Sequence, residues 1–302
     1  MKDKGDIAAS VALTHILTPG KSKEMRIHAL ALTLGQLLAV ASCSNAWATD
    51  ESNIIPHSPY VGKTVVMAIQ YDWEPLSFKN DQGQPTGYFY DIAAAAAARL
   101  GAKVEVTSGD FAAVIPAIQS GKFTVAAGLD ATTERQAVVD VASTVNAGYQ
   151  IIVLKKTDIP ENASLDDFCG RTIALLASHP STKTFEAQSE KCIAEGKKTI
   201  TVSQFPDRGA TWLALRSGRA DATLGYSGEN GWLLKSQSDL KRVGPIIDTT
   251  YAGIPVSKQS GNAKYWVEAI NSLIADGTYK NILAKYGVPE VAIPRSELNP
   301  VK

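Results

Sequence analysis

Short apolar runs alternate with longer amphipathic stretches through most of the chain beyond residue 60. The run 64–69 is short and almost wholly apolar, which is typical of a buried strand. The stretch 91–99 begins at an aspartate, is rich in alanine and is followed by Gly101, which is typical of a helix. The same reasoning predicts strand 64–69, helix 91–99, strand 103–107, helix 111–119, strand 124–127 and a helix that begins at 132–135.

This alternation starts again after a polar linker at 158–162. Strands that alternate with helices in this way favour an α/β fold with a parallel sheet. A strand at 150–155 comes before the linker, and a polar helix end at 235–241, a strand at 253–256 and helices at 265–275 and 279–285 close the chain. The second series itself has strands 172–176, 199–202 and 222–224 and helices 181–194 and 207–216.

An internal repeat supports two similar units. The segment 117–124, AIQSGKFT, has a counterpart in 214–221, ALRSGRAD, with Gly121 and Gly218 at corresponding places. In open α/β sheets the loops at the carboxyl ends of the strands form the binding crevice. Two such units that face each other would therefore hold a ligand between them.

Composition excludes several classes of function. The chain has 302 residues, of which 30 are basic and 30 acidic, and 45% are hydrophobic. Such a chain suits a globular protein of one or two domains. Its balanced charge gives no reason to expect a nucleic acid as partner, and no group of His or Cys has the spacing of a metal site. We expect no cofactor and no metal.

Residues 1–48 are predicted to be an export signal and not part of the fold. Met25 to His28 form a charged start, and the apolar stretch 29–41 is too short to span a membrane. Met25 is then the expected start of translation. Ala46-Trp47-Ala48 has the form of a cleavage site, so cleavage after Ala48 would release the protein into the periplasm. Residues 49–60 are expected to be a linker.

A second interpretation of the N-terminus stays open. Val40-Ala41-Ser42-Cys43 is similar to a bacterial lipobox, in which Cys43 would be acylated and would anchor the protein as a lipoprotein. Cys169 and Cys192 then remain as an even pair, which predicts a disulfide in an oxidising compartment. The alternative is that both are free, buried thiols.

The segment 124–135 carries the first candidate for binding chemistry. A small apolar strand ends at Gly128, and Thr132 and Thr133 can cap a helix that has Arg135 in its first turn. The helix dipole disfavours a cation there, so the position makes sense if Arg135 binds a carboxylate through its two-pronged guanidinium. The alternative is that Arg135 pairs with Glu134 or faces solvent.

A series of short motifs in a fixed order gives the chain a resemblance to a known family. Over about 62–291 it resembles the extracytoplasmic solute-binding proteins of bacterial polar amino-acid ABC transporters, family 3 solute-binding proteins. Each motif is weak by itself, but their order and spacing are specific. The motifs are Trp73–Phe78, Gly87-Tyr88 with Asp91, Asp110–Ala117, Ser120-Gly121, Gly128–Arg135 with Asp140, Leu165–Thr172, Ser217–Asp221 and Ala275–Tyr279.

The resemblance implies the periplasmic-binding-protein type 2 fold, in which two α/β lobes are joined by two hinge strands and close over a ligand. Lobe 1 would comprise 61–147 plus 254–292, and lobe 2 would comprise 151–248. The hinges would lie near 146–150 and 249–253, and 293–302 would form a C-terminal tail.

The family's binding residues can be carried over position by position. Arg135 matches the arginine that binds the ligand α-carboxylate, and Trp73 and Phe111 match aromatic residues that sandwich the ligand. Gln70, Gly128 and Asp130 match positions that contact it through polar side chains or backbone. Ser178 and Ser181 lie in the matching loop of lobe 2. His179, in the same loop, either contacts the ligand or serves only as a spacer before the helix.

The sequence departs from the family at two places. Asp130 stands where a Ser or Thr is usual, and Tyr226 stands where an aspartate binds the ligand α-amino group. Glu229 lies three residues farther on. The ligand therefore either lacks a primary α-amine or has a quaternary or modified amine, held in an aromatic cage of Trp73, Phe111 and Tyr226 with the negative charge of Asp130 or Glu229 nearby. Alternatively, Tyr226 lies in the core and Glu229 replaces the aspartate.

We therefore expect a monomeric, non-enzymatic protein that binds a small carboxylate-bearing solute, an amino acid or a derivative of one. It would deliver that solute to the permease of an ABC importer by hinge closure. No Ser/His/Asp arrangement with recognisable spacing favours catalysis. Two alternatives stay open. One is a periplasmic enzyme of the cyclohexadienyl dehydratase type, and the other is an accessory or receptor protein of a quinoprotein dehydrogenase system.

Overall fold

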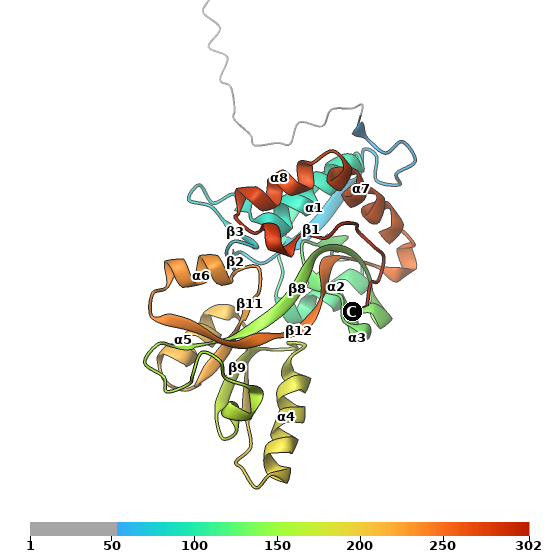
Figure 1. The fold of residues 1–302 in the computed structure, drawn as a ribbon. Coiled ribbons are helices and arrows are strands. Elements are labelled where there is room, and N and C mark those ends of the chain that lie inside the picture. The colour runs from blue at the N-terminus through green and yellow to red at the C-terminus, as the bar shows by residue number, and fades with distance from the viewer. Residues whose placement is uncertain (1–52, 302) are drawn as a thin grey trace, which may run out of the picture. The chain divides into compact units, whose positions relative to one another are not determined.

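One large mixed sheet, with parallel and antiparallel pairs of strands, runs through residues 53–301, the part of the chain that this computed structural model describes (Figure 1). The predicted export signal, the cleavage site after Ala48 and Cys43 lie outside these residues. The nine strands lie in the order β10 (Thr201–Phe205), β9 (Thr172–Leu176), β11 (Ala222–Tyr226), β8 (Asp140–Leu154), β12 (Leu240–Val256), β6 (Val125–Ala126), β1 (Thr64–Ile69) and β5 (Lys103–Ser108), with β7 (Leu129–Asp130) paired to β12 beside this path.

The sheet consists of two parallel groups of strands. β1 pairs in parallel with β5 and β6, and β9 pairs in parallel with β10 and β11. We call the first group, with its helices, the first α/β unit, and the second group, with its helices, the second α/β unit. A small antiparallel sheet of β2 (Asp72–Trp73), β3 (Ser77–Lys79) and β4 (Pro85–Thr86) belongs to the first unit.

Two long antiparallel strands join the two units. β8 and β12 pair from Leu154 with Leu240 at one end to Asp140 with Val256 at the other. Their register shifts at three places along the way, the last between Ala252 and Gly253. A side chain at Gly253 would collide with the carbonyl oxygen of Ala142, so the two strands can approach this closely only with glycine there.

The helices of each unit cover its own part of the sheet (Figure 1). In the first unit α1, α7 and α8 pack against one another, while α2 and α3 lie near the crossing strands. In the second unit α4 and α5 pack against the strands β9 to β11, and α6 packs against β12. The bounds are α1 (Tyr88–Arg99), α2 (Val114–Gln119), α3 (Thr133–Val138), α4 (Thr182–Ala194), α5 (Arg208–Arg216), α6 (Asn230–Ser236), α7 (Ala263–Ala275) and α8 (Thr278–Lys285).

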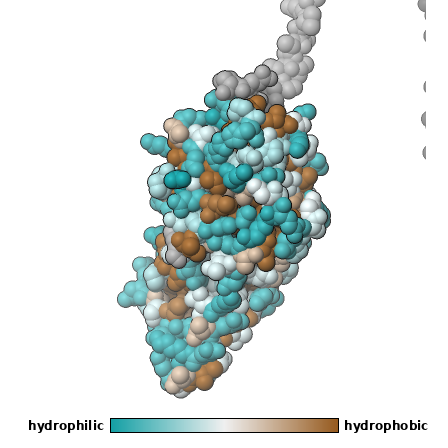
Figure 2. Space-filling view, turned by 90° about the vertical axis from the view of Figure 1, so that its right-hand side faces the viewer, coloured by the Kyte–Doolittle hydropathy of each residue, from teal (hydrophilic) through white to brown (hydrophobic). Residues whose placement is uncertain are grey.

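The alanine run of α1 explains how closely this helix packs. Ala93, Ala96 and Ala97 are fully buried, and so is Trp266 on the neighbouring α7. Small side chains on α1 leave room for the large ring on α7 at native packing density. On the surface, apolar residues are scattered among polar ones, and Figure 2 shows no continuous brown band on the face it displays. None of the helices in the described residues is long and apolar enough to cross a bilayer.

Helix α1 begins earlier than the sequence predicts. Its first residue is Tyr88 and not Asp91, and backbone carbonyls of Pro75 and Leu76 accept hydrogen bonds from Tyr88 N and Phe89 N. Because the loop before the helix satisfies these first N–H groups, no aspartate cap is needed. Asp91 instead accepts hydrogen bonds from Lys285 and Tyr286, at 2.8 and 2.7 Å, and so ties α1 to the end of α8.

The crossing strands differ most from the predicted elements. The predicted strands 150–155 and 253–256 are only the ends of β8 and β12, which have 15 and 17 residues. The prediction of a helix end at 235–241 is wrong over its second half, because α6 ends at Ser236 and β12 begins at Leu240. The middles of both strands contain polar residues and glycine, so only their mutual pairing, which composition does not reveal, makes them strands.

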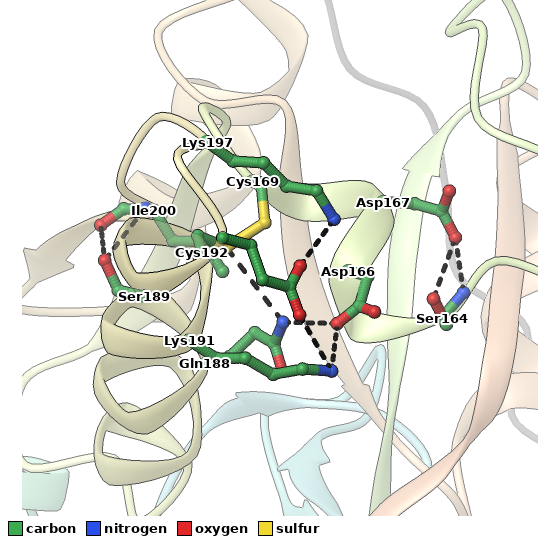
Figure 3. The surroundings of a disulfide bond; sticks show 11 residues. Ser164, Asp166, Asp167, Cys169, Gln188, Ser189, Lys191, Cys192, Lys197 and Ile200 are labelled. Carbon is green, nitrogen blue, oxygen red and sulfur yellow. Dashed lines mark hydrogen bonds and ion pairs between the residues drawn. A yellow bond between two sulfur atoms is a disulfide. The ribbon is translucent and has the colours of Figure 1, made fainter.

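The predicted disulfide between Cys169 and Cys192 is confirmed (Figure 3). Cys169 follows a short 3-10 turn, Leu165–Phe168, and Cys192 lies near the end of α4. The carboxylate of Asp166, in the same turn, accepts hydrogen bonds from Lys191 and Gln188 on α4, at 2.8 and 2.6 Å. The bridge and these polar contacts together fix the outer end of α4 to the rest of the second unit.

Loss of the disulfide is expected to lower the free energy of unfolding by about 3 kcal/mol, because the bridge restricts the unfolded chain. Equilibrium urea unfolding of the oxidised protein, compared with that of Cys169→Ser/Cys192→Ser, measures the difference. Reduction of the wild type with excess dithiothreitol should reproduce the value for the double variant. Equal unfolding midpoints for the oxidised and bridge-free proteins would contradict this expectation.

Candidate functional site

Arg135 lies at the start of α3, where the first unit approaches the second. Thr132 caps the helix and accepts a hydrogen bond from Arg135 N. The Arg135 side chain is 10% exposed, and its guanidinium lies over the ring of Phe111, 5.0 Å from the ring centre. Nη1 donates to Asp130 Oδ2 at 3.2 Å, and Nη2 donates to the carbonyl oxygen of Ser178 at 3.4 Å. The guanidinium therefore bridges the two units.

Glu134, the alternative partner considered for Arg135, is engaged elsewhere. Its carboxylate accepts a hydrogen bond from Lys183 Nζ at 2.6 Å, at an exposed contact between α3 and α4. The acid that neutralises Arg135 is Asp130, which is 4% exposed. Since Asp130 stands where the resembling family has a neutral Ser or Thr, this chain supplies its own carboxylate to the arginine.

Tyr149 on β8 completes this pair. Its hydroxyl donates to Asp130 Oδ2 at 2.5 Å. Burial raises the pKa of Asp130, while the charge of Arg135 and the hydrogen bond from Tyr149 act in the opposite direction. Burial, together with the negative charge of Asp130, raises the pKa of Tyr149 well above its usual value. The phenol therefore stays protonated and serves as a donor.

A second arginine–carboxylate pair lies close to the first. Arg208 Nη2 donates to both carboxylate oxygens of Glu229, at 2.9 and 2.8 Å, and Glu229 is 1% exposed. Trp73 Nε1, from the first unit, donates to Glu229 Oε2 at 2.6 Å, and Tyr226 N donates to Oε1 at 2.9 Å. The Arg208 guanidinium also lies over the Trp73 ring, 5.0 Å from its centre. This pair too connects the two units.

Tyr226 lies among aromatic rings and is 1% exposed. Its ring makes edge-to-face contacts with Trp73, Phe89 and Tyr149, at centroid distances of 5.5, 6.0 and 5.5 Å. Burial raises the pKa of Tyr226 well above its usual value. Within the described residues its hydroxyl has no hydrogen-bond partner. Phe111 is absent from these ring contacts and lies instead against Arg135.

His179 is a neutral imidazole in the loop before α4. Burial, with the nearby charges of Arg135 and Arg208, lowers its pKa from 6.5 to about 3. Its Nδ1 accepts a hydrogen bond from Ser181 N at 3.2 Å, which leaves the proton on Nε2. Its ring packs edge-on against Tyr149, with centroids 4.5 Å apart. Ser181 itself is fully buried and precedes the first residue of α4.

The residues singled out in the sequence surround two small cavities and one open groove. Trp73, Phe111, His179 and Arg208 line a cavity of about 20 Å³, and Gln70, Gly128 and Trp73 line another of about 20 Å³. Each has room for about one water molecule. Arg135, Ser178 and His179 also face an open groove of about 870 Å³. The two units thus meet closely around the predicted site.

Two contributors to this arrangement were missed in the sequence. Arg208 begins a helix that follows a strand end, and Asp207 before it accepts a hydrogen bond from Ala210 N. This is the pattern that singled out Arg135, so the same signal was available. Tyr149 has no comparable signal, because its place depends on the pairing of β8 with β12. The described residues contain no group of three His, Cys, Asp or Glu that could hold a metal ion.

Comparisons with known proteins identify the family of the chain. Residues 65–289 match the family model "Bacterial extracellular solute-binding proteins, family 3". The arginine-binding protein ArgT of Corynebacterium glutamicum is 29% identical over 231 residues, which cover 74% of each chain. An ancestral arginine-binding protein solved with arginine has a TM-score of 0.66 and 28% identity, with 74% of this chain and 98% of that chain covered.

A third similarity concerns the amino-acid-binding ancestor of an enzyme. The ancestral amino acid-binding protein AncCDT-1, a precursor of cyclohexadienyl dehydratase, has a TM-score of 0.64 and 26% identity, with 74% of this chain and 95% of that chain covered. The family match spans most of the chain, and the two solved structures have a similar fold. This chain belongs to family 3 of the bacterial extracellular solute-binding proteins.

Proposed function

We propose that the protein binds a small carboxylate-bearing solute, an amino acid or a derivative of one, between its two units and delivers it to the permease of an ABC importer. The observation that carries this proposal is the position of Arg135. Its guanidinium is buried where the units meet, is held by a helix start in one unit and donates to the Ser178 carbonyl of the other. A ligand carboxylate there would accept paired hydrogen bonds from it.

The proposed movement is a rotation of the units about the crossing strands. Lobe 1 would comprise 61–147 plus 254–292, and lobe 2 would comprise 151–248, with 293–302 as a tail. The hinges near 146–150 and 249–253 are supported by the register shifts between β8 and β12 in this region and by Asp248, whose φ is +50°. Irregular pairing of this kind interrupts the hydrogen bonds between two strands locally and allows the strands to bend there.

The small cavities support the idea that the described structure is a closed form. The space that Trp73, Phe111 and His179 line is too small for an amino acid, so this would be a closed form without solute, and the units would lie farther apart than here when a solute enters and when it is held. The contacts of Trp73 with Glu229, Arg135 with Ser178 and Lys183 with Glu134 would then break and form again as the units move.

The proposed setting is the periplasm, where a monomer would carry the solute to the permease. The disulfide Cys169–Cys192 supports an oxidising compartment. A binding role is favoured over catalysis because each acid near the cavities is already engaged. Glu229 accepts hydrogen bonds from three residues, and Asp130 accepts them from Arg135 and Tyr149. Neither is placed as a free proton donor or nucleophile.

Replacement of Arg135 tests the proposal directly. Arg135→Gln removes charge-assisted hydrogen bonds to the ligand carboxylate, so affinity is expected to fall by about 100-fold or more. Native mass spectrometry of the purified wild type identifies any solute it carries. Isothermal titration with that solute, or with a panel of L-arginine, L-histidine and L-glutamine, measures the loss.

Two further variants show whether a loss of affinity is due to Arg135 itself. Arg99→Gln serves as the control, because Arg99 is also well covered and paired, with Asp276, but lies at the far end of α1. Asp130→Asn/Arg135→Gln removes both charges together and so leaves no unpaired buried carboxylate. A double variant that folds and still binds the solute as tightly as the wild type would overturn the proposed role of Arg135.

The depressed pKa of His179 predicts a pH dependence of stability. In the unfolded chain His179 takes up a proton near pH 6.5, whereas in the folded protein it does so only near pH 3. Its contribution to stability is therefore complete above pH 6.5 and is lost as the pH falls toward 3, by about 1.4 kcal/mol for each pH unit. Urea unfolding of the wild type and of His179→Gln at pH 7, 5.5 and 4.5 measures this slope.

His57→Gln is the matched control, since the His57 side chain is 61% exposed. We expect the wild type and His57→Gln to lose stability with similar slopes, and His179→Gln to have a shallower slope below pH 6. If His179→Gln loses stability on acidification as steeply as the wild type, then His179 is not the buried neutral group described above.

A further inference from the structure

Arg208 presents an unused hydrogen-bond donor beside the proposed binding site. Its side chain is 11% exposed and lines the same small cavity as Trp73, Phe111 and His179. Nη2 is fully engaged by Glu229, but Nε is buried and has no partner among the residues that the structure describes. A buried N–H without an acceptor costs free energy, so this atom is a position where an acceptor from a ligand would be stabilising.

The polar groups around this cavity are mostly donors. Neutral His179 has its remaining proton on Nε2, and Arg208 offers Nε. Thr211 and Thr223 each donate their hydroxyl to a backbone carbonyl, so these side chains can act only as weak acceptors toward a ligand. None of the residues that line the cavity has a carboxylate. A ligand group that meets this wall is offered N–H donors.

The two carboxylates nearest to the cavity are already neutralised. Glu229 accepts hydrogen bonds from Arg208, from Trp73 Nε1 and from Tyr226 N, which occupy both of its oxygens. Asp130 is paired with Arg135 and Tyr149. A ligand ammonium would have to displace Arg208 from Glu229, and the guanidinium would then be left buried without its counter-charge.

The same arginines cover the aromatic rings on which a ligand cation could lie. The Arg135 guanidinium lies over Phe111, and the Arg208 guanidinium lies over Trp73, each 5.0 Å from the ring centre. Arg208 is also 5.7 Å from the ring centre of Trp212 on its own helix. A quaternary ammonium group could use these ring faces only after it had replaced a guanidinium of the protein, against like-charge repulsion.

We propose that Arg208 determines ligand specificity, and that the solute is a carboxylic acid whose second polar group is an uncharged or anionic acceptor, such as a 2-oxo group or a second carboxylate, and not a primary or quaternary amine. This inference rests on the proposed function, since Arg135 would bind the first carboxylate. Arg208 would receive the acceptor through Nε. Glu229 holds the guanidinium in place and neutralises its charge.

Isothermal titration with matched pairs of ligands tests this. Each pair is an amino acid and its 2-oxo acid: leucine and 4-methyl-2-oxopentanoate, phenylalanine and phenylpyruvate, glutamate and 2-oxoglutarate. Glutarate, which has two carboxylates but no 2-oxo group, is titrated as well. It shows whether the preferred acceptor is a second carboxylate or a 2-oxo group. In at least one set the wild type is expected to bind the member without an amine at least about tenfold more tightly than the amino acid.

Variants of Arg208 test whether this residue causes the preference for the ligand without an amine. Arg208→Gln frees the Glu229 carboxylate, so the preference is expected to fall at least about tenfold and to shift toward the amino acid. Arg208→Gln/Glu229→Gln removes both charges and avoids an unpaired buried acid, and it is expected to discriminate little between the members of a pair. Arg216→Gln, at the exposed end of the same helix, should keep the wild-type preference.

The outcomes separate this inference from the proposed function. If the wild type binds an amino acid as tightly as its 2-oxo acid, or more tightly, and Arg135→Gln abolishes that binding, then the proposed function stands and the role of Arg208 is overturned. An unchanged preference in a folded Arg208→Gln/Glu229→Gln double variant overturns it as well. If the wild type binds no member of any set and carries no small carboxylic acid after purification, then the proposed function fails together with this inference.

Discussion

The arrangement of the site depends on the neutralisation of two buried guanidinium groups by two buried carboxylates. Arg135 pairs with Asp130 within the first unit, and Arg208 pairs with Glu229 within the second. An unpaired charge in this environment would cost several kcal/mol, and because each pair lies within one unit, the proposed separation of the units would leave both pairs intact. What connects the units is therefore not an ion pair between buried charges but the weaker contacts that these pairs make, such as Trp73 Nε1 with Glu229 and Arg135 with the Ser178 carbonyl.

This placement of one ion pair in each unit suits the proposed opening and closing of the units. Each unit carries its own compensating charge, so separation exposes polar groups to water without leaving a bare ion in a dry interior. The polar contacts between the units, such as those of Trp73 Nε1 and of Lys183 Nζ, could be replaced by hydrogen bonds to water at modest cost. A ligand then shifts the balance only by the difference in its affinity for the two forms, which requires the open and closed forms to be close in free energy.

The fold could be predicted from the sequence where a strand is buried on both faces, because such a strand is a short run of apolar residues. β1 and β9 coincide with the predicted strands 64–69 and 172–176, and the repeat around Gly121 and Gly218 indicated two units. The full length of the crossing strands could not be predicted. The middle of β8 is polar, with Asn146 and Gln150, and it is extended only through its pairing with β12. For the same reason the sequence singled out Arg135 through its local helix start, but it could not show that Asp130 and Tyr149, which lie 19 residues apart, meet.

The presence of Tyr226, where the family usually has an aspartate, changes which carboxylate lies in this part of the site. Tyr226 is buried in a cluster of rings, and Glu229 lies three residues farther on, just before α6. Yet Glu229 does not offer a free carboxylate, because the backbone N–H of Tyr226 and the guanidinium of Arg208 occupy it. A ligand ammonium and Arg208 would compete for the same two oxygens, and Arg208 is held near them by its helix and by the Trp73 ring. The cation in this part of the site thus belongs to the protein, which supports the proposal that the ligand supplies an acceptor.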